Sequence, residues 1–243
     1  MIEFEHVRRT YGKKVAVADL TLAVPPGQLF SFLGPNGAGK TTTIKLLVGL
    51  LRPTSGTIRV CDFDVVAQPR HANHLLGYVP DEPYVYDKLS GREFLRFVAD
   101  MHGLGKHESA THIEREIGHF ELASFVDELA ENYSHGMKQR LAFAAALLHD
   151  PRVLVVDEPM VGLDPRSVRL VKDLLRRKAR EGMTVFMSTH SLFVAEEISD
   201  RIGIVDQGEL KFLGTLAELR NQVAMQHMSL EDLYLQITAR AEV

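Results

Sequence analysis

The stretch that decides the fold runs Gly34-Pro35-Asn36-Gly37-Ala38-Gly39-Lys40-Thr41. It fits the pattern G-x-x-x-x-G-K-[ST], in which glycines let successive backbone N–H groups point into one concave nest. Lys40 would add a positive charge near the β- and γ-phosphates of a nucleotide, and the Thr41 hydroxyl would contact Mg²⁺. The stretch therefore predicts a phosphate-binding loop.

The segments on either side of this loop predict a strand and a helix. Residues 28–33 form a short apolar run, which is typical of a strand. Residues 42–51 are expected to be helical, with one apolar face made of Ile44, Leu47, Val48 and Leu51. A strand, a loop and a helix are the setting that a phosphate loop requires, which disfavours a glycine-rich turn that matches by chance.

Composition limits the class of protein. The chain has 243 residues, of which 45% are hydrophobic and 25% charged, so we expect one domain with a smaller insert or two small domains. The net charge of −4 disfavours recruitment by nucleic acid or by an anionic membrane. A single cysteine, Cys61, favours a reducing compartment. With no signal peptide or membrane span predicted, any membrane role would require a partner.

Strands and helices alternate along most of the chain, which predicts an α/β fold with a parallel sheet covered by helices. Residues 1–24 alternate between polar and apolar, and we expect a small antiparallel region there. Residues 86–149 have helical periodicity throughout, so they are interpreted as a helical insert between two strands of the sheet. The other buried strands are predicted at 57–60, 75–79, 153–157 and 184–188.

The insert carries two local patterns. Ser90 and Glu93 have the spacing of a capping box at a helix start. Four histidines lie close together in its sequence without the cysteine or carboxylate spacing of a metal site, so they are expected at the surface: His102, His107, His112 and His119.

Three polar residues follow predicted strands and are candidates for catalysis. Asp157 and Glu158 end the apolar run 153–157, at the edge of a parallel sheet where ligands bind. We interpret Asp157 as a metal ligand and Glu158 as the general base that activates water. His190 follows the next strand and could hold the γ-phosphate or the attacking water. A solvated Asp-Glu-Pro turn and a structural histidine are the alternatives.

A second phosphate-binding end is predicted in the insert. Ser134 can cap the helix that follows it, and Gly136 allows close approach to a phosphate. Within one chain this helix need not reach the first loop, so a second chain, facing head to tail, is the hypothesis that would bring the two together.

Taken in order, these motifs resemble the nucleotide-binding subunit of ABC transporters. The resemblance makes residues 34–41 the Walker A motif, 153–157 the Walker B motif, 134–137 the signature and 162–164 the D-loop. It implies the ABC ATPase version of the P-loop NTPase fold, with a mixed, mainly parallel core, an antiparallel β-subdomain and an inserted helical subdomain. The implied boundaries are one domain at 1–220, comprising a core at 1–85 and 150–220 with the insert at 86–149, and a helical tail at 221–243.

The resemblance also implies the ligands and the residues that hold them. ATP and Mg²⁺ are the expected cofactors, with Glu158, His190 and Lys40 in catalysis. The implied metal ligands are Thr41, Asp157 and Asp81. The implied ATP contacts, beginning with a tyrosine that stacks on adenine, are Tyr11, Gly34, Pro35, Asn36, Gly37, Ala38, Gly39, Lys40, Thr41, Thr42, Ser134 and Gly136.

The sequence departs from the family pattern in two places. The signature is usually Leu-Ser-Gly-Gly-Gln, whereas residues 133–137 read Tyr-Ser-His-Gly-Met. Asp81 stands where the family has a glutamine after the strand 75–79. Aspartate is a hard oxygen ligand that could face magnesium, but it is shorter than glutamine and cannot donate a hydrogen bond.

Residues 229–237 are similar to the short C-terminal helix of subunits that serve separate exporter permeases. The leading hypothesis is an ATPase that dimerises on ATP, with an identical or different second subunit, and powers export through a transmembrane permease. It would lie in the cytoplasm, peripheral to the membrane, with no direct contact to nucleic acid. The alternatives are a soluble ABC-type ATPase acting on nucleic acid and a nucleotide-binding regulator without turnover.

Overall fold

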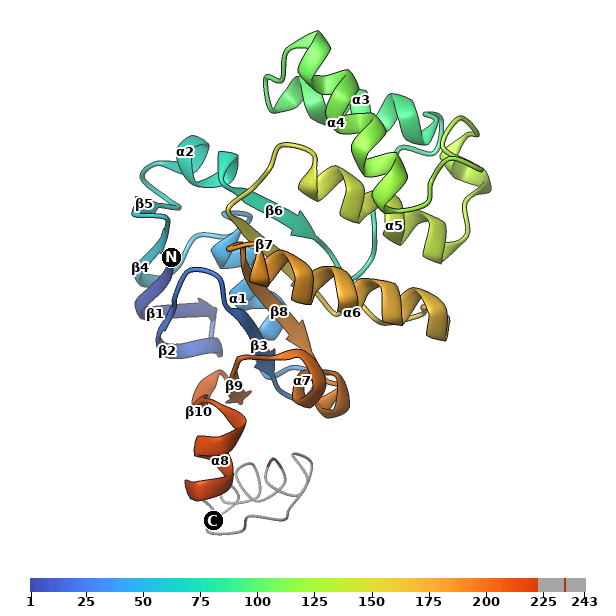
Figure 1. The fold of residues 1–243 in the computed structure, drawn as a ribbon. Helices are drawn as coiled ribbons and strands as arrows, with labels where there is room; N and C mark the ends of the chain where they lie inside the picture. Colours follow the sequence, from blue (N-terminus) through green and yellow to red (C-terminus); the bar gives the residue numbers. More distant parts are fainter. Residues whose placement is uncertain (223–233, 235–243) are drawn as a thin grey trace.

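A computed structural model describes residues 1–222 and Tyr234. Apart from Tyr234, the predicted tail helix at 229–237 lies outside the described residues. The described chain folds into two β-sheets and a projecting group of helices (Figure 1). The larger sheet has the order β10-β9-β3-β8-β7-β6 and is parallel except for the β9–β10 hairpin. Its strands are β3 (Leu29–Leu33), β6 (Leu76–Val79), β7 (Val153–Asp157), β8 (Thr184–Thr189), β9 (Arg201–Asp206) and β10 (Glu209–Gly214).

The smaller sheet is antiparallel and has the order β2-β1-β4-β5. Its strands are β1 (Ile2–Tyr11), β2 (Lys14–Val24), β4 (Ser55–Val60) and β5 (Phe63–Asp64). Phe186 joins the two sheets, because its ring lies 6.2 Å from that of Phe4 in β1 and 5.3 Å from that of Phe30 in β3. This aromatic contact is part of a continuous apolar core between the sheets.

Helices cover both faces of the larger sheet. The first, α1 (Lys40–Leu47), contacts strands of both sheets and therefore lies between them. On the other face α6 (Pro165–Arg180) packs across β3 and β8, beside α7 (Leu192–Ile198) (Figure 1). Two shorter helices, α2 (Pro69–His74) and α8 (Leu216–Gln222), lie near the sheet edges. The arrangement confirms the predicted α/β fold with an antiparallel region.

The helices between β6 and β7 lie within residues 86–149, the expected insert, and project away from the sheets (green to yellow in Figure 1). The insert contains α3 (Gly91–Met101), α4 (Lys106–His119), the short 3₁₀ turn η1 (Ala130–Asn132) and α5 (His135–Leu147). The α5 helix joins the insert to β6 so closely that a Cβ on Gly77 would lie 2.3 Å from the Ala146 carbonyl oxygen. The capping box of Ser90 and Glu93 is confirmed at the start of α3.

Two local predictions are wrong. The helix after the phosphate loop ends at Leu47 rather than Leu51, because the chain turns at Gly49, whose φ is 74°. Two of the four insert histidines are also not simply surface residues. The ring of His102 stacks on His149 at 3.6 Å, and His112 Nδ1 lies 2.8 Å from the Leu148 carbonyl oxygen. Both side chains therefore contact the residues directly after α5, Leu148 and His149.

Over residues 1–222, none of the helices combines the length and apolar character needed to span a bilayer.

Candidate active site

A cleft of about 450 Å³ opens where the chain leaves β3, β6 and β7. This is the edge at which the carboxyl ends of the parallel strands meet, and the volume falls in the range of small-molecule sites. The cleft is lined by Tyr11, Lys14, Ala16, Pro35, Asn36, Gly37, Gly39, Lys40, Thr41, Thr42, Asp81 and Glu158. The structure thus brings most of the residues assigned to ATP into one cavity.

The phosphate loop is shaped by glycines in backbone conformations that other residues rarely adopt. Gly37 and Gly39 have φ angles of 85° and 107°, and a Cβ on Gly39 would lie 2.4 Å from the Ala16 carbonyl oxygen. Gly39 is the N-cap of α1 and no side chain caps this helix end, so its first N–H groups are available to an anion.

Two residues of the phosphate loop, which the motif assigns to ATP binding, instead pack against the protein behind the loop. Gly34 and Ala38 are buried and do not line the cleft. A Cβ on Gly34 would lie 2.4 Å from the Val205 carbonyl oxygen, so this glycine permits close packing on β9. Ala38 accepts a hydrogen bond from the backbone N–H of Gly208 (3.0 Å), and Gly208 in turn accepts one from Ala18 of β2 (2.9 Å). The turn between β9 and β10 therefore holds the phosphate loop from behind.

Lys40 is nearly buried and has partners within the protein. Its Nζ donates to the Gly34 carbonyl oxygen at 2.7 Å and lies 3.5 Å from Glu158 Oε1. A buried ammonium group requires such compensation, and a phosphate oxygen would supply the same negative charge.

Glu158 is held in a strained backbone conformation, with a φ of 46°. Its N–H donates to both the carbonyl and the hydroxyl oxygen of Ser188, each at 3.2 Å. Its carboxylate lies between Lys40 and His190, whose Nδ1 is 2.9 Å from Glu158 Oε2. The side chain is 15% exposed, so it is shielded but open to a water molecule from the cleft.

Asp157 is fully buried behind the cleft, and Ser188 Oγ donates to its Oδ1. The pKa of this carboxyl group is raised, mainly because burial disfavours its charged form. Hydrogen bonds from Ser188 and Thr41 lower the pKa in part, whereas the charge of Asp81 raises it further. Its Oδ2 is buried without a hydrogen-bond partner among the described residues. An unpartnered carboxylate oxygen beside the Thr41 hydroxyl suits a Mg²⁺ ion.

The protein alone would not complete a metal site. Within residues 1–222 no three His, Cys, Asp or Glu side chains come close enough together to hold an ion. A Mg²⁺ ion bound here would therefore share oxygen ligands from phosphate and water, as Mg²⁺ commonly does.

Asp81 and Tyr11 both line the cleft. Asp81 is exposed in the loop after β6, lines the cleft, and accepts a hydrogen bond from the Glu82 N–H at 3.0 Å. Tyr11 is 44% exposed at the end of β1, and the Arg9 guanidinium lies 4.6 Å from its ring centroid. Because Arg9 covers one face of the ring, only the other face is free for a base.

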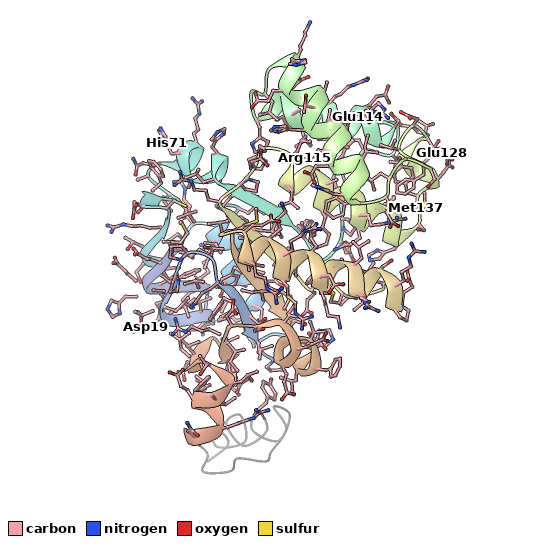
Figure 2. The ribbon with its side chains drawn as sticks, in the orientation of Figure 1. Asp19, His71, Glu114, Arg115, Glu128 and Met137 are labelled. Atoms are coloured by element: carbon pink, nitrogen blue, oxygen red, sulfur yellow. The ribbon has the colours of Figure 1, made fainter. Side chains whose placement is uncertain are left out.

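Ser134 and Gly136 are not in the cleft. Ser134 is the exposed N-cap of α5 and accepts a hydrogen bond from the Met137 N–H at 3.3 Å. Figure 2 shows the neighbouring Met137 on the helical insert. The structure therefore places the two predicted phosphate-binding ends on different parts of the chain.

Sequence reasoning missed three residues of the site. Lys14 lines the cleft because it pairs with Tyr11 across the β1–β2 turn, and Ala16 approaches Gly39 through its carbonyl oxygen. Ser188 contacts both strand-end acids because it lies opposite Asp157 in the β7–β8 pair. Position in a predicted hairpin could have indicated Lys14, whereas nothing in the sequence distinguishes Ser188 from other strand serines.

Comparison with known proteins gives consistent results. Residues 17–161 match the family model described as ABC transporter. The linearmycin resistance ATP-binding protein LnrL of Bacillus subtilis is 36% identical over 90% of this chain and 70% of its own length. The Nod factor export ATP-binding protein I of Burkholderia pseudomallei is 38% identical over 85% of this chain and 68% of its own length.

Solved structures share the fold. One described as an ATP binding subunit of an ABC transporter has a TM-score of 0.92 and 30% identity, and covers 98% of this chain and 99% of its own. A dimeric, post-hydrolysis ATP-binding cassette bound to ADP and Pi has a TM-score of 0.82 and 24% identity, and covers 89% of this chain and 99% of its own.

Proposed function

The chain belongs to the ABC transporter family, and we propose that it is the ATP-hydrolysing subunit of an exporter with a separate permease. The relatives that suggest export are named for linearmycin resistance and for Nod factor export. The proposal includes dimerisation on ATP and a peripheral position at the cytoplasmic face of the membrane, where the permease would hold the subunit.

The arrangement around Glu158 carries the proposal. A γ-phosphate at the phosphate loop would replace the Gly34 carbonyl and Glu158 as the partners of Lys40. Glu158 would then be free to accept a proton from the attacking water, while His190 holds its carboxylate in place. A Mg²⁺ ion held by Thr41 and Asp157, with Asp81 facing it, would neutralise charge on the phosphates.

A second subunit would complete the site. Ser134, the N-cap of α5, is exposed and does not line the cleft of its own chain, so this helix end is accessible to a second chain. Two chains facing head to tail would bring this end to the partner's γ-phosphate. The dimeric cassette with ADP and Pi, which has the same fold, supports dimerisation.

The permease would dock in a groove between the core and the helical insert. The groove has a volume of about 330 Å³, and its mainly apolar lining includes Tyr84, Phe94 and Val98. Tyr84 is 76% exposed at its mouth, beside the half-exposed Tyr86. An apolar groove with exposed aromatic residues suits a short amphipathic segment of a membrane partner. Pro80 and Tyr84 of this groove lie close in sequence to Asp81 of the cleft, so one loop would connect the docked permease with the cleft.

Substitution of Glu158 tests the proposed chemistry. Glu158→Gln should lower the Mg²⁺-dependent release of phosphate from ATP by about 10²–10⁴-fold, because the amide cannot accept the proton of water. Binding of a fluorescent ATP analogue should remain. The matched control is Glu82→Gln, an exposed acid that does not line the cleft. Unchanged hydrolysis in the Glu158 variant would remove this residue as the base.

A further inference from the structure

His135 connects two segments that the proposed function uses separately. Its Nε2 lies 3.2 Å from the carbonyl oxygen of Val161. A carbonyl oxygen only accepts, so Nε2 carries the hydrogen of this bond. His135 is the first residue of α5 in the helical insert, directly after the cap Ser134. Val161 belongs to the loop that follows the base Glu158.

The contact extends to both sides of the hydrogen bond. A Cβ on Gly162 would lie 3.1 Å from the His135 ring, so the ring packs directly on the backbone of this glycine. One on Gly136 would lie 3.8 Å from the Leu163 side chain. The α5 end and the loop therefore meet through two successive residues of α5 and three successive residues of the loop, and a side chain at Gly162 would push the ring away.

The loop itself is firmly attached to the core. Its backbone closes a turn in which the Val161 N–H donates to the Glu158 carbonyl oxygen at 3.2 Å. At its other end Asp164 caps α6 by accepting from the N–H groups of Arg166 and Ser167 at 2.9 and 3.0 Å. The hydrogen bond from His135 to Val161 therefore ties the start of α5 to the loop that begins at Glu158.

A nearby ion pair between Arg166 and Glu121 is weaker than the His135 hydrogen bond. Arg166 and Glu121 approach within 3.3 Å across the same boundary, but both side chains are exposed. An exposed ion pair contributes little, because water and salt screen it. The His135 bond uses a backbone carbonyl and a packed ring, so it fixes position more closely.

We propose that His135 is a positioning residue that fixes the α5 end to the 158–164 loop of its own chain. The two surfaces that a second subunit would meet then move as one body when ATP closes the dimer. This role rests on the proposed function, because it requires ATP-dependent dimerisation. The glycine that the family usually has here carries no side chain to make the bond.

The test measures dimerisation without hydrolysis. In the Glu158→Gln background with Mg²⁺ and ATP, sedimentation should give a dimer whose dissociation constant rises about three- to tenfold on His135→Ala, because closure of the dimer must then order the α5 end and the 158–164 loop in each chain. His135→Gln should restore it, because the amide N–H can replace Nε2–H. ATP binding by the monomer should not change, since His135 is outside the cleft. His107→Ala, an exposed histidine elsewhere in the insert, is the matched control.

A second measurement uses the monomer alone. Without nucleotide, His135→Ala should increase amide hydrogen exchange in residues 160–164 while the free energy of unfolding stays near that of the parent. Equal dimer affinity in the presence and absence of the His135 side chain would overturn the positioning role. Failure of the parent Glu158→Gln protein to dimerise would overturn the proposed dimer, and this role with it.

Discussion

Ser188 connects the two acids at the end of β7, since its hydroxyl donates to Asp157 and accepts from the Glu158 N–H. One side chain thus orients a residue suited to metal binding and the residue suited to act as a base. Groups that orient ligands in this way affect a site nearly as strongly as the ligands themselves.

Ser188→Ala should therefore raise the Mg²⁺ concentration that half-activates ATP hydrolysis by about tenfold. The pKa of Asp157 should rise further, because the bond that lowers it is lost. A Mg²⁺ titration of ATPase activity checks this. Ser31→Ala is the control, since Ser31 is equally buried on the neighbouring β3 but pairs with Ser199. An unchanged Mg²⁺ requirement would show that Ser188 does not orient the site.

At the residue scale the sequence predicts which side chains meet but not what holds them. The Gly-Lys-Thr pattern and the acid Glu158 after an apolar run predicted residues that line one cleft, with Asp157 buried behind it, because their positions follow from strand ends. Ser188 could not be predicted, since its role depends on which residue of β7 lies opposite in β8. The packing role of Gly34 could not be predicted either, because it depends on which strand lies beside the loop, here β9.

At the scale of elements, a capping box fixes where the first helix of the insert begins. The α3 helix begins with Ser90, which accepts from the Glu93 N–H at 3.2 Å while the Glu93 carboxylate accepts from the Ser90 N–H at 2.8 Å. Each bond satisfies a backbone donor that the helix cannot satisfy by itself. The bonds also hold the Glu93 carboxylate ionised, so its pKa is lowered.

Ser90→Ala should lower the free energy of unfolding by about 1 kcal/mol, the usual cost of losing a helix cap. Urea denaturation at neutral pH measures the change. The control is Ser124→Ala, an exposed serine in the loop between α4 and α5. Equal stability of the two variants would contradict a stabilising cap at Ser90.

Elements were predictable where one local signal decides them. Apolar runs gave the buried strands, and the capping pattern gave the start of α3. The early end of α1 was missed because apolar residues continue past Leu47, whereas the left-handed conformation of Gly49 ends the helix. Helix propensity alone cannot decide whether the apolar residues extend the helix or Gly49 ends it, because the surrounding core also contributes.

At the scale of the whole molecule, His149 at the end of the insert contacts Leu76 of β6 in the core. His149 is 9% exposed, its Nε2–H donates to the Leu76 carbonyl oxygen at 3.0 Å, and its Nδ1 is buried without a partner among the described residues. Burial, followed by the neighbouring His102, lowers the pKa of His149 to about 4, although the bond to Leu76 opposes this shift. The folded protein thus holds this ring neutral.

Stability should therefore fall on acidification. Between pH 6.5 and about 4 the unfolded chain binds a proton at His149 that the folded chain does not, so each pH unit removes up to about 1.4 kcal/mol. Above pH 6.5 the contribution is fully present. His149→Gln keeps a donor for Leu76 and should reduce the loss of unfolding free energy between pH 7 and pH 5. His107→Gln is the exposed control, and equal pH dependence in both variants would contradict the assignment.

The whole-molecule arrangement was predictable in outline and not in its contacts. An insert between two strands of a parallel sheet follows from the order of patterns along the chain. The stacking of His102 on His149 joins residues that are far apart in sequence, so the expected surface position of His102 missed this contact.

The turn between β9 and β10 has a consequence for the speed of nucleotide exchange. Gly208 joins the phosphate loop to β2 through Ala38 and Ala18, so the loop acquires its shape when the chain folds. An arriving nucleotide meets a cradle that needs no further ordering, and its association rate should approach that of a simple encounter. Residence time in the cleft would then depend on how fast the phosphates leave Lys40 rather than on opening of the loop.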